Sequence, residues 1–447
     1  MIQHIRRYKR MLLTLSFLGG FGMLILSGCS NPSDSGDKAR VEGYATDENG
    51  NEGFEKPASG VEGATVTMVR ANAQGNFESV TDASATTNAS GHFSLEADVE
   101  GEENLIVSAQ KGSQTWRSHI SGTVESGSTV RTAPMTTETS VEAEVYARMV
   151  ARGEANAWSV SEMKSDVNRQ VAMATHGSAT AYGDLASAFR NKTEAEAEAL
   201  SHSSVGLTSS QIDAIASAKA EAQANLESEL YAAYGNQSQT TQAYAEAEAE
   251  VRQAYESNNA DAEARARTHT ISGKVLLQST SSLNSSARGA LAQRTSLRTA
   301  TALDAAVRAQ MQALGASSGE IDAVASAGAT LQSSIKTAST VGEVKAAFET
   351  YHNAVLTELS NSSSINVSGD LVAEIDTSVN SSSGARVTLE AAISAAISLG
   401  IDVSAVVDAY VQFYNSVQSI VESTLTSASN ADVQAVASIM ILVNMST

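Results

Sequence analysis

No proline occurs after Pro134 in this chain of 447 residues. Proline interrupts a helix because its ring clashes with the preceding turn and its nitrogen carries no hydrogen to donate. Alanine, glutamate, glutamine and serine dominate the same stretch, and these residues permit long helices and argue against a strand-rich second half. We therefore predict a large all-α helical-bundle region from residue 138 onward.

Capping boxes predict where several of these helices begin. In such a box a Ser or Thr side chain accepts from the backbone three residues later, and a Glu or Gln at that position reaches back. The candidate pairs are Thr139 with Glu142, Ser159 with Glu162, Thr208 with Gln211, Ser317 with Glu320, and Thr340 with Glu343. Narrow apolar stripes flanked by alanine follow, and they favour close helix packing in a bundle.

The stretch 268–298 departs from the helical pattern. Thr268 to Leu277 is strand-like or a helix restart, and serine and asparagine follow. We therefore predict helical region 1 over 138–267, a linker over 268–298 and helical region 2 over 299–447. The later helices are the more apolar ones, so we expect them to be buried; an exposed patch that docks on a partner is the alternative.

A weak internal similarity links the two helical regions. Residues 209–218 (SSQIDAIASA) match residues 318–327 (SGEIDAVASA), and residues 183–189 match residues 342–348. The two motifs occur in opposite order in the two halves. This indicates either a duplicated bundle or convergence of two alanine-rich sequences.

The stretch 41–133 predicts a small all-β sandwich. Residues 61–69, 92–95 and 105–109 have high β propensity, and turn sequences with a terminal glycine separate them. The fold class is therefore multidomain, with a small sandwich ahead of the helical bundle.

Three motifs in this β stretch resemble the carboxypeptidase regulatory-like domain, which is a transthyretin-like β-sandwich. They are a Gly-x-x-x-Asp-x-x-Gly run at 43–50, Gly-Ala-x-Val at 63–66, and Thr-x-x-x-Gly-x-Phe-x-Leu at 87–95. The resemblance implies an accessory module with no catalytic residues to carry over.

Residues 1–28 have the pattern of a signal peptide. A basic start is followed by an apolar run from Met11 to Ile25, too short to span a membrane comfortably. Leu26-Ser-Gly-Cys29 then resembles the bacterial lipobox. That resemblance implies that Cys29 is the lipidated N-terminus and that Ser30 favours the outer membrane. The small polar residues that follow indicate a flexible tether over 29–40. An uncleaved anchor with a chance cysteine is the alternative.

Composition excludes several functions. Cys29 is the only cysteine, which rules out an internal disulfide, a Cys-rich zinc site and an iron–sulfur cluster. The formal net charge is −21, whereas binding to nucleic acid requires a basic face. The signal peptide holds four basic and no acidic residues, so the mature chain is more acidic still.

The sequence contains only incomplete motifs for catalysis or metal binding. Glu349 and His352 form only one half of a di-iron motif, and Gly315 to Gly319 matches a hydrolase elbow but follows a helix rather than a strand. Asp47, with Asn49 and Asn51, starts a calcium-loop pattern that lacks its glycine and final glutamate. We predict no catalytic, cofactor-binding or metal-binding residues.

These observations predict a non-catalytic, lipid-anchored cell-envelope protein of the outer membrane with a structural or interaction role. Its expected partners are the membrane, through Cys29, and an envelope protein or glycan, but no nucleic acid. The alternatives are a ligand-binding component of an envelope uptake or assembly system, and an enzyme with an unrecognised helical active site.

Overall fold

Two small sheets form the first part of the computed structural model, which describes residues 38–47, 59–99, 101–202, 205–398 and 400–446. The first sheet has the order β11-β1-β6, with β1 parallel to β11 and antiparallel to β6. The second has the order β5-β4-β8-β9 and is antiparallel throughout. Their bounds are β1 Ala39–Tyr44, β4 Thr65–Ala71, β5 Phe77–Thr86, β6 His92–Ala97, β8 Leu105–Lys111, β9 Gln114–His119 and β11 Thr129–Arg131.

Short strand pairs complete this region: β2 Thr46–Asp47 with β3 Ser59–Gly60, and β7 Glu102–Glu103 with β10 Thr123–Val124. Strands are present in the expected stretches 61–69, 92–95 and 105–109, although the first of them, β4, begins only at Thr65. β1 begins at Ala39, inside the stretch expected as a tether, because its side chains alternate between buried and partly exposed positions and pair with β6.

One hydrophobic core lies between the two sheets. Alternate residues of each strand point the same way, so Val41 and Phe93 of the first sheet join Met68 and Val107 of the second in a single buried cluster. Trp116 of β9 belongs to the same cluster and is 9% exposed. These contacts are those of two sheets packed face to face.

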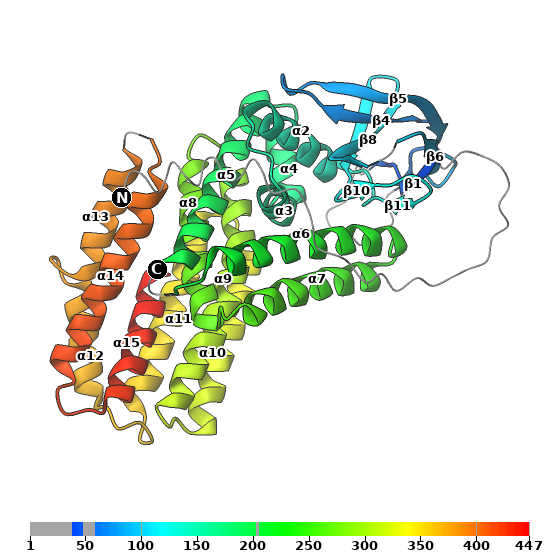
Figure 1. The fold of residues 1–447 in the computed structure, drawn as a ribbon. Coiled ribbons are helices and arrows are strands. Elements are labelled where there is room, and N and C mark those ends of the chain that lie inside the picture. Colours follow the sequence, from blue (N-terminus) through cyan, green and yellow to red (C-terminus); the bar gives the residue numbers. More distant parts are fainter. Residues whose placement is uncertain (1–37, 48–58, 100, 203–204, 399, 447) are drawn as a thin grey trace. The chain divides into compact units, whose positions relative to one another are not determined.

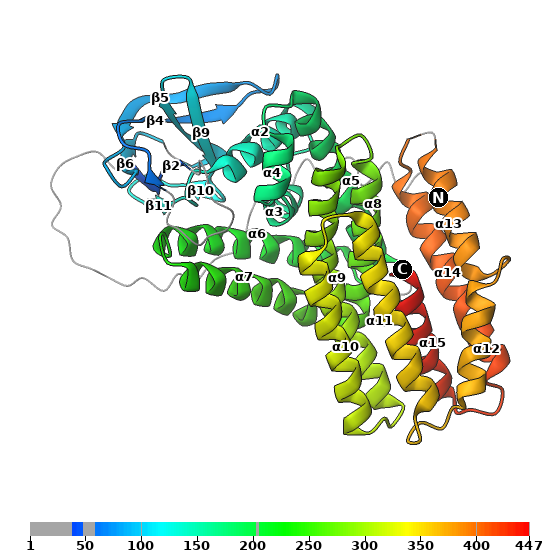
Figure 2. The same ribbon diagram turned by 180° about the vertical axis from the view of Figure 1, so that it is seen from behind.

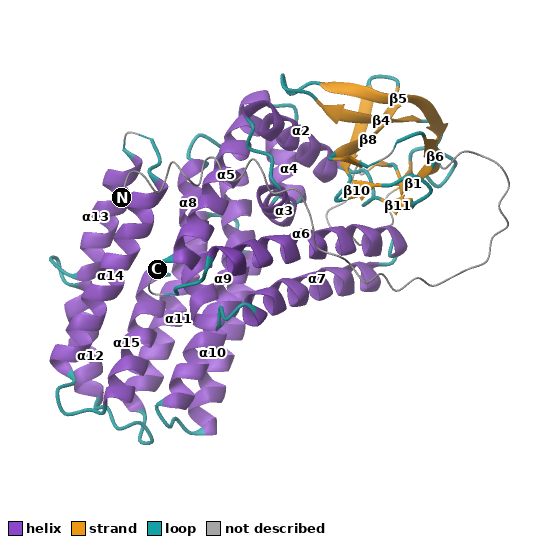
Figure 3. Ribbon diagram, viewed as in Figure 1, coloured by secondary structure: helices purple, strands orange, loops and turns teal. Residues whose placement is uncertain are grey.

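Helices make up the rest of the chain, as the sequence predicts (Figure 3). Their bounds are α2 Thr137–Arg152, α3 Ala157–Asp166, α4 Arg169–Thr175, α5 Ala179–Ser201, α6 Ser209–Ala232, α7 Gln237–Ser257, α8 Ala262–Ser279, α9 Ser285–Ala313, α10 Ser318–Thr337, α11 Val341–Asn361, α12 Gly369–Asn380, α13 Ala385–Ile397, α14 Val403–Thr424 and α15 Asn430–Met445. α2 packs on β9, where the backbone N–H of Arg117 donates to Ser140 Oγ at 3.0 Å.

No helix among the described residues is long and apolar enough to cross a membrane.

Three predicted capping boxes are present, those that start α6, α10 and α11. The other two are displaced by one turn. Thr136 caps α2 with Thr139 as the third residue, and Asn156 caps α3 with Ser159 as the third residue. The glutamates expected to close those boxes, Glu142 and Glu162, are instead buried inside the fold.

The predicted linker over 268–298 is wrong, because these residues belong mainly to α8 and α9, two helices that pack closely against each other. The β-branched and hydroxyl side chains that suggested a strand or a loop fit inside this helix pair. Thr268 and Thr295 are both buried, and Thr295 Oγ1 donates to the Leu291 carbonyl at 2.9 Å. A hydroxyl that returns its hydrogen bond to the preceding turn can be buried in a helix.

The later helices are the apolar ones, as expected. A single hydrophobic cluster runs from α8 and α9 to α15, and Val436, Ile439 and Leu442 of α15 have no exposed surface. α15 is enclosed by α9, α11 and α14. Unlike α15, which packs on several helices, α7 packs mainly on α6. The two helices lie side by side as a hairpin (Figures 1 and 2).

Candidate functional site

A buried cluster of charges joins α3, α5, α6 and α9. Glu162 of α3 is at its centre and pairs with Lys192, with Lys219 at 2.7 Å and with Arg298 at 3.4 Å. Burial alone would raise the pKa of Glu162, but the three cations overcome that effect and hold the pKa well below its usual range. The carboxylate therefore stays ionised although almost none of its side chain reaches solvent.

Two more acids and a phenol complete this ionic cluster. Asp166 lies 2.9 Å from Lys192 and 2.7 Å from Arg298, and Glu196 lies 2.5 Å from Lys219 and accepts from the Tyr255 hydroxyl. The cluster thus holds three carboxylates and three cations. Removing one partner from such a set leaves an uncompensated buried charge, which costs about 3–5 kcal/mol.

A second ionic contact fixes the middle of α6 to the β region. Lys164 of α3 pairs with Glu227 of α6 and donates to the His119 carbonyl at 2.9 Å. Glu227 also accepts from the backbone N–H of Ser121 at 3.0 Å and from its hydroxyl at 2.7 Å. Both charged side chains are nearly fully buried.

Aromatic rings hold the end of α6 against the first sheet. Tyr44 of β1 stacks on Tyr234 with ring centroids 4.0 Å apart, and it tilts against Tyr231 at 5.3 Å. The Tyr231 hydroxyl lies 3.2 Å from His92 Nε2 and donates to Glu42 Oε2 at 3.3 Å. These rings are partly exposed.

The three contacts lie on one face of α6, because Lys219, Glu227 and Tyr231 are spaced by four or eight residues. An ordinary helix packs an apolar stripe against its neighbours, whereas α6 buries the charged Lys219 and Glu227 beside Ala222 and Leu226 beyond its first two turns. We call α6 and α7 together, residues 209–257, the α6–α7 arm. At its base, Ile212, Ile215 and Tyr255 join a small hydrophobic cluster.

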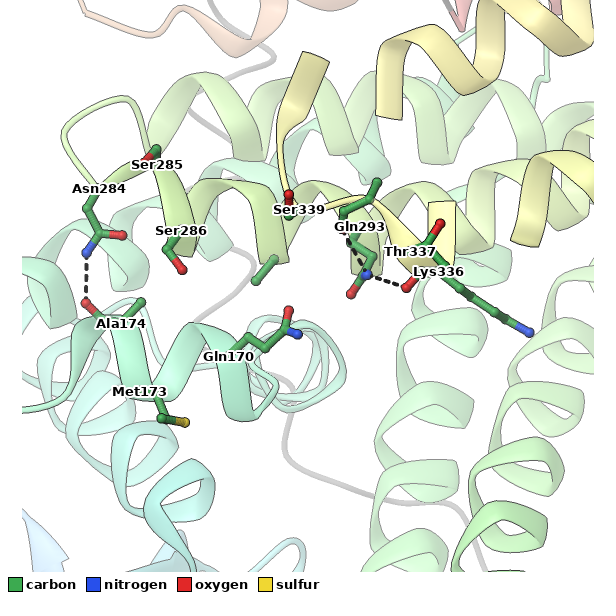
Figure 4. A pocket seen from close by; sticks show the side chains of 12 residues that line it. Gln170, Met173, Ala174, Asn284, Ser285, Ser286, Gln293, Lys336, Thr337 and Ser339 are labelled. Atoms are coloured by element: carbon green, nitrogen blue, oxygen red, sulfur yellow. Dashed lines mark hydrogen bonds between the residues drawn. The ribbon is translucent and has the colours of Figure 1, made fainter. Parts of the chain in front are cut away.

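A cavity of about 720 Å³ lies apart from these clusters, between α4, the start of α9 and the α10–α11 link (Figure 4). Amide and hydroxyl side chains line it, with Lys336 and the thioether of Met173. Met173 is 64% exposed, an unusual degree for so apolar a side chain. Asn284 and Gln293 are held in place by hydrogen bonds to the carbonyls of Ala174 and Lys336.

The residues that the sequence singled out do not come together. Cys29, with the signal peptide and most of the tether, lies outside the described residues, as do Asn49 and Asn51 of the rejected calcium loop. His352 lies 3.1 Å from Asp376, whereas Glu349 faces solvent beside Lys345. In the described part of the chain, no three His, Cys, Asp or Glu side chains are grouped as a metal ion would require.

Ser317, the central residue of the hydrolase-like pattern, is the N-cap of α10 and follows α9 rather than a strand. Trp116 is a core residue of the β region, while Trp158 lies beneath the Lys219 ammonium, which is 5.3 Å from its ring.

Sequence reasoning missed the ionic cluster. The sequence pattern predicts that Glu162 closes a capping box, and it does not point to Lys192, Lys219 or Arg298 as its partners. One signal was available: Lys219 follows Ile215 by four residues and Ile212 by seven, so it falls within the apolar stripe of α6. A lysine in that position must either reach solvent or find a buried acid.

Comparisons with known proteins provide no further guide. No protein-family model, no curated protein and no solved structure matches this chain.

Proposed function

We propose that this chain is a non-catalytic, lipid-anchored protein of the bacterial outer membrane, with a structural or interaction role in the cell envelope. The observation that carries the proposal is the box Leu26-Ser-Gly-Cys29, which follows a basic start and an apolar run and contains the chain's only cysteine. Several acyl chains on one residue anchor a protein far more firmly than a single chain.

The chemistry of the described residues supports a role without catalysis. The ionic cluster is charge-balanced, and each of its cations already pairs with acids of the same cluster. Active sites instead place perturbed titratable groups around an accessible cavity. The cavity beside α9 has Lys336 as its one titratable lining residue among those described. The resemblance of the β stretch to an accessory module points in the same direction.

Acylation of Cys29 can be tested directly. Cells that express the full chain are fed a fatty acid carrying an alkyne, and the purified protein is probed for the label. We expect label on the unchanged protein and on the neighbouring control Ser30→Ala, and none on Cys29→Ala. Label that persists in Cys29→Ala, or that is missing from the unchanged protein, contradicts the proposal.

A second candidate function is ligand binding in an envelope uptake or assembly system, and the cavity is the observation that favours it. Its hydroxyl and amide lining suits a neutral, hydrogen-bonding ligand such as a glycan or a peptide backbone. We expect a glycan or peptide from a broad panel to raise the melting temperature of the unchanged protein. Ser286→Trp, which fills the cavity from an exposed position, should abolish that rise. A panel without any effect excludes this candidate.

A further inference from the structure

The α6–α7 arm is attached to the rest of the fold in an unusual way. α7 packs mainly on α6, while α6 reaches the body through α3, α5 and β11. Beyond the apolar base, α6 is fixed by the ion pairs of Lys219 and Glu227, by the rings of Tyr231 and Tyr234, and by two buried apolar side chains, Ala222 and Leu226. Gly206 and Asn259, which have backbone φ of 72° and 65°, flank the arm at its two connections.

Two histidines, His119, which is buried, and His269, which is partly buried, lie beside the lysines that hold this arm. His119 is 3% exposed, its ring lies 4.3 Å from Tyr146, and neither ring nitrogen has a hydrogen-bond partner. Its own carbonyl accepts from Lys164, the residue that pairs with Glu227 of α6. An imidazolium here would have no acceptor and would face an ammonium group.

His269 of α8 lies near the cations of the ionic cluster, as His119 lies near Lys164. Its ring meets the edge of Tyr255 at 5.5 Å. The charged groups around it come from four helices: Lys219 of α6, Arg298 of α9, Lys192 of α5 and Glu162 of α3. Because the cluster is balanced at three charges of each sign, a proton on His269 would make it net positive.

We propose that the α6–α7 arm is an acid-sensitive element, which swings away from the body about its apolar base when His119 and His269 become protonated. The central carboxylate of the ionic cluster, Glu162, keeps its charge in mild acid, so protonation of the histidines starts the release. Release uncovers the rings of Tyr44 and Tyr234 and the buried face of α3.

Both pKa directions agree with this geometry. Burial and Lys164 hold the pKa of His119 well below its usual range, and burial with Lys219, Arg298 and Lys192 does the same for His269. A histidine whose folded-state pKa is depressed adds stability above about pH 6.5, and that stability is lost as the pH falls toward the folded value. Glu162 has a pKa well below 4.5 and keeps its charge throughout this range.

Other groups at the arm do not provide the same trigger. Glu142 of α2 lies close enough to Lys164 and Glu227 to interact electrostatically with both. Burial raises its pKa well above the usual range, so acid neutralises it and relieves a buried charge. His92 contacts Tyr231 through Nε2, and a protonated ring can still donate to that hydroxyl.

Hydrogen exchange on the full chain tests the proposal. We compare amide protection in α6 and α7 with that in α10 and α11 at pH 7.5 and pH 5.0, after correction for intrinsic exchange rates. We expect protection in the arm to fall by at least about tenfold at pH 5.0, since each unit of pKa depression corresponds to a factor of about ten. Protection in α10 and α11 should stay unchanged.

Variants identify the trigger. The double variant His119→Gln with His269→Gln should keep the arm protected at both pH values, and each single variant should remove part of the response. The control His352→Gln alters a buried histidine on α11 and should leave the response intact. If the double variant does not fold, the single variants decide. An arm that stays protected at pH 5.0, a simultaneous loss in α10 and α11, or an unaltered response in both single variants overturns the proposal.

Discussion

Helices α6 and α10 begin alike and pack differently. Seven of their first ten residues are identical, and each starts at a capping box, Thr208 with Gln211 and Ser317 with Glu320. The eleventh residue is Lys219 in α6 and Gly328 in α10.

Both positions face buried acids, and the two helices accommodate them in opposite ways. Lys219 brings a cation to Glu162 and Glu196. Gly328 instead leaves room for Asp304 of α9, whose charge is met by Arg308 at 2.9 Å on its own helix. The capping sequence that the two helices share therefore sets where each helix begins. The eleventh residue determines whether the helix meets a buried acid with a cation, as Lys219 does, or leaves space for the acid, as Gly328 does.

The largest effect is expected from Lys219→Met, which keeps the length of the side chain and removes its charge. Glu196 then loses the ammonium that pairs with it and keeps its hydrogen bond from the Tyr255 hydroxyl. We expect the local free energy of opening of α6, measured by hydrogen exchange, to fall by about 3–5 kcal/mol. Lys345→Met, on an exposed lysine that lies 3.9 Å from Glu349, should change stability by less than about 0.5 kcal/mol. Equal small effects of the two would mean that the buried cluster does not hold the arm.

Gly328→Ala tests the other half of the comparison. A Cβ at this position would lie 2.2 Å from Asp304 Oδ1, so the carboxylate must move away from Arg308 and from the Tyr351 hydroxyl. We expect a loss of about 1–3 kcal/mol in urea unfolding. The control is Gly319→Ala in the first turn of α10, where a Cβ meets nothing within 4 Å, and it should stabilise by about 0.4–1 kcal/mol. The comparison fails if both changes have the same sign.

Local sequence signals located the elements well, because they depend on neighbours in the chain. The order of sheets and helices, three helix starts and the buried C-terminal helices could all be predicted from propensity, caps and apolar periodicity. The errors came from residues whose partners are distant. Glu162 fits a capping pattern three residues after Ser159, and only Lys192, Lys219 and Arg298, which arrive from other helices, show that it belongs to a buried cluster.

The linker between 268 and 298 failed for a related reason. Hydroxyl and β-branched residues lower helix propensity when considered alone, but packing between α8 and α9 favours small side chains such as Gly273 beside Thr295. Whether a threonine is exposed in a loop or buried between helices depends on a partner helix that local patterns do not specify.

The smallest effects are expected at the shared caps. Thr208→Ala and Ser317→Ala each remove the acceptor for one backbone N–H at the helix start. Each should cost about 0.5–2 kcal/mol, and we expect similar losses in the two helices because the local geometry is the same. Urea unfolding measures the loss, and exchange in the first turn of each helix shows that it is local. A loss at one cap alone would show that the matching motifs are not equivalent.

The same caps should differ in their response to acid. Hydrogen bonds from Ser362 and Ser317 lower the pKa of Glu320 to about 2, whereas Gln211 does not titrate. A carboxylate with a depressed folded-state pKa contributes its full stability above about pH 4.5 and loses it as the pH falls toward 2. Glu320→Gln should therefore reduce protection of the first turn of α10 at pH 6 and change it progressively less toward pH 3. Gln211→Glu should give α6 the acid dependence that α10 has naturally. If α6 gained no such dependence, the acid response of α10 would come from its surroundings rather than from the capping box that the two helices share.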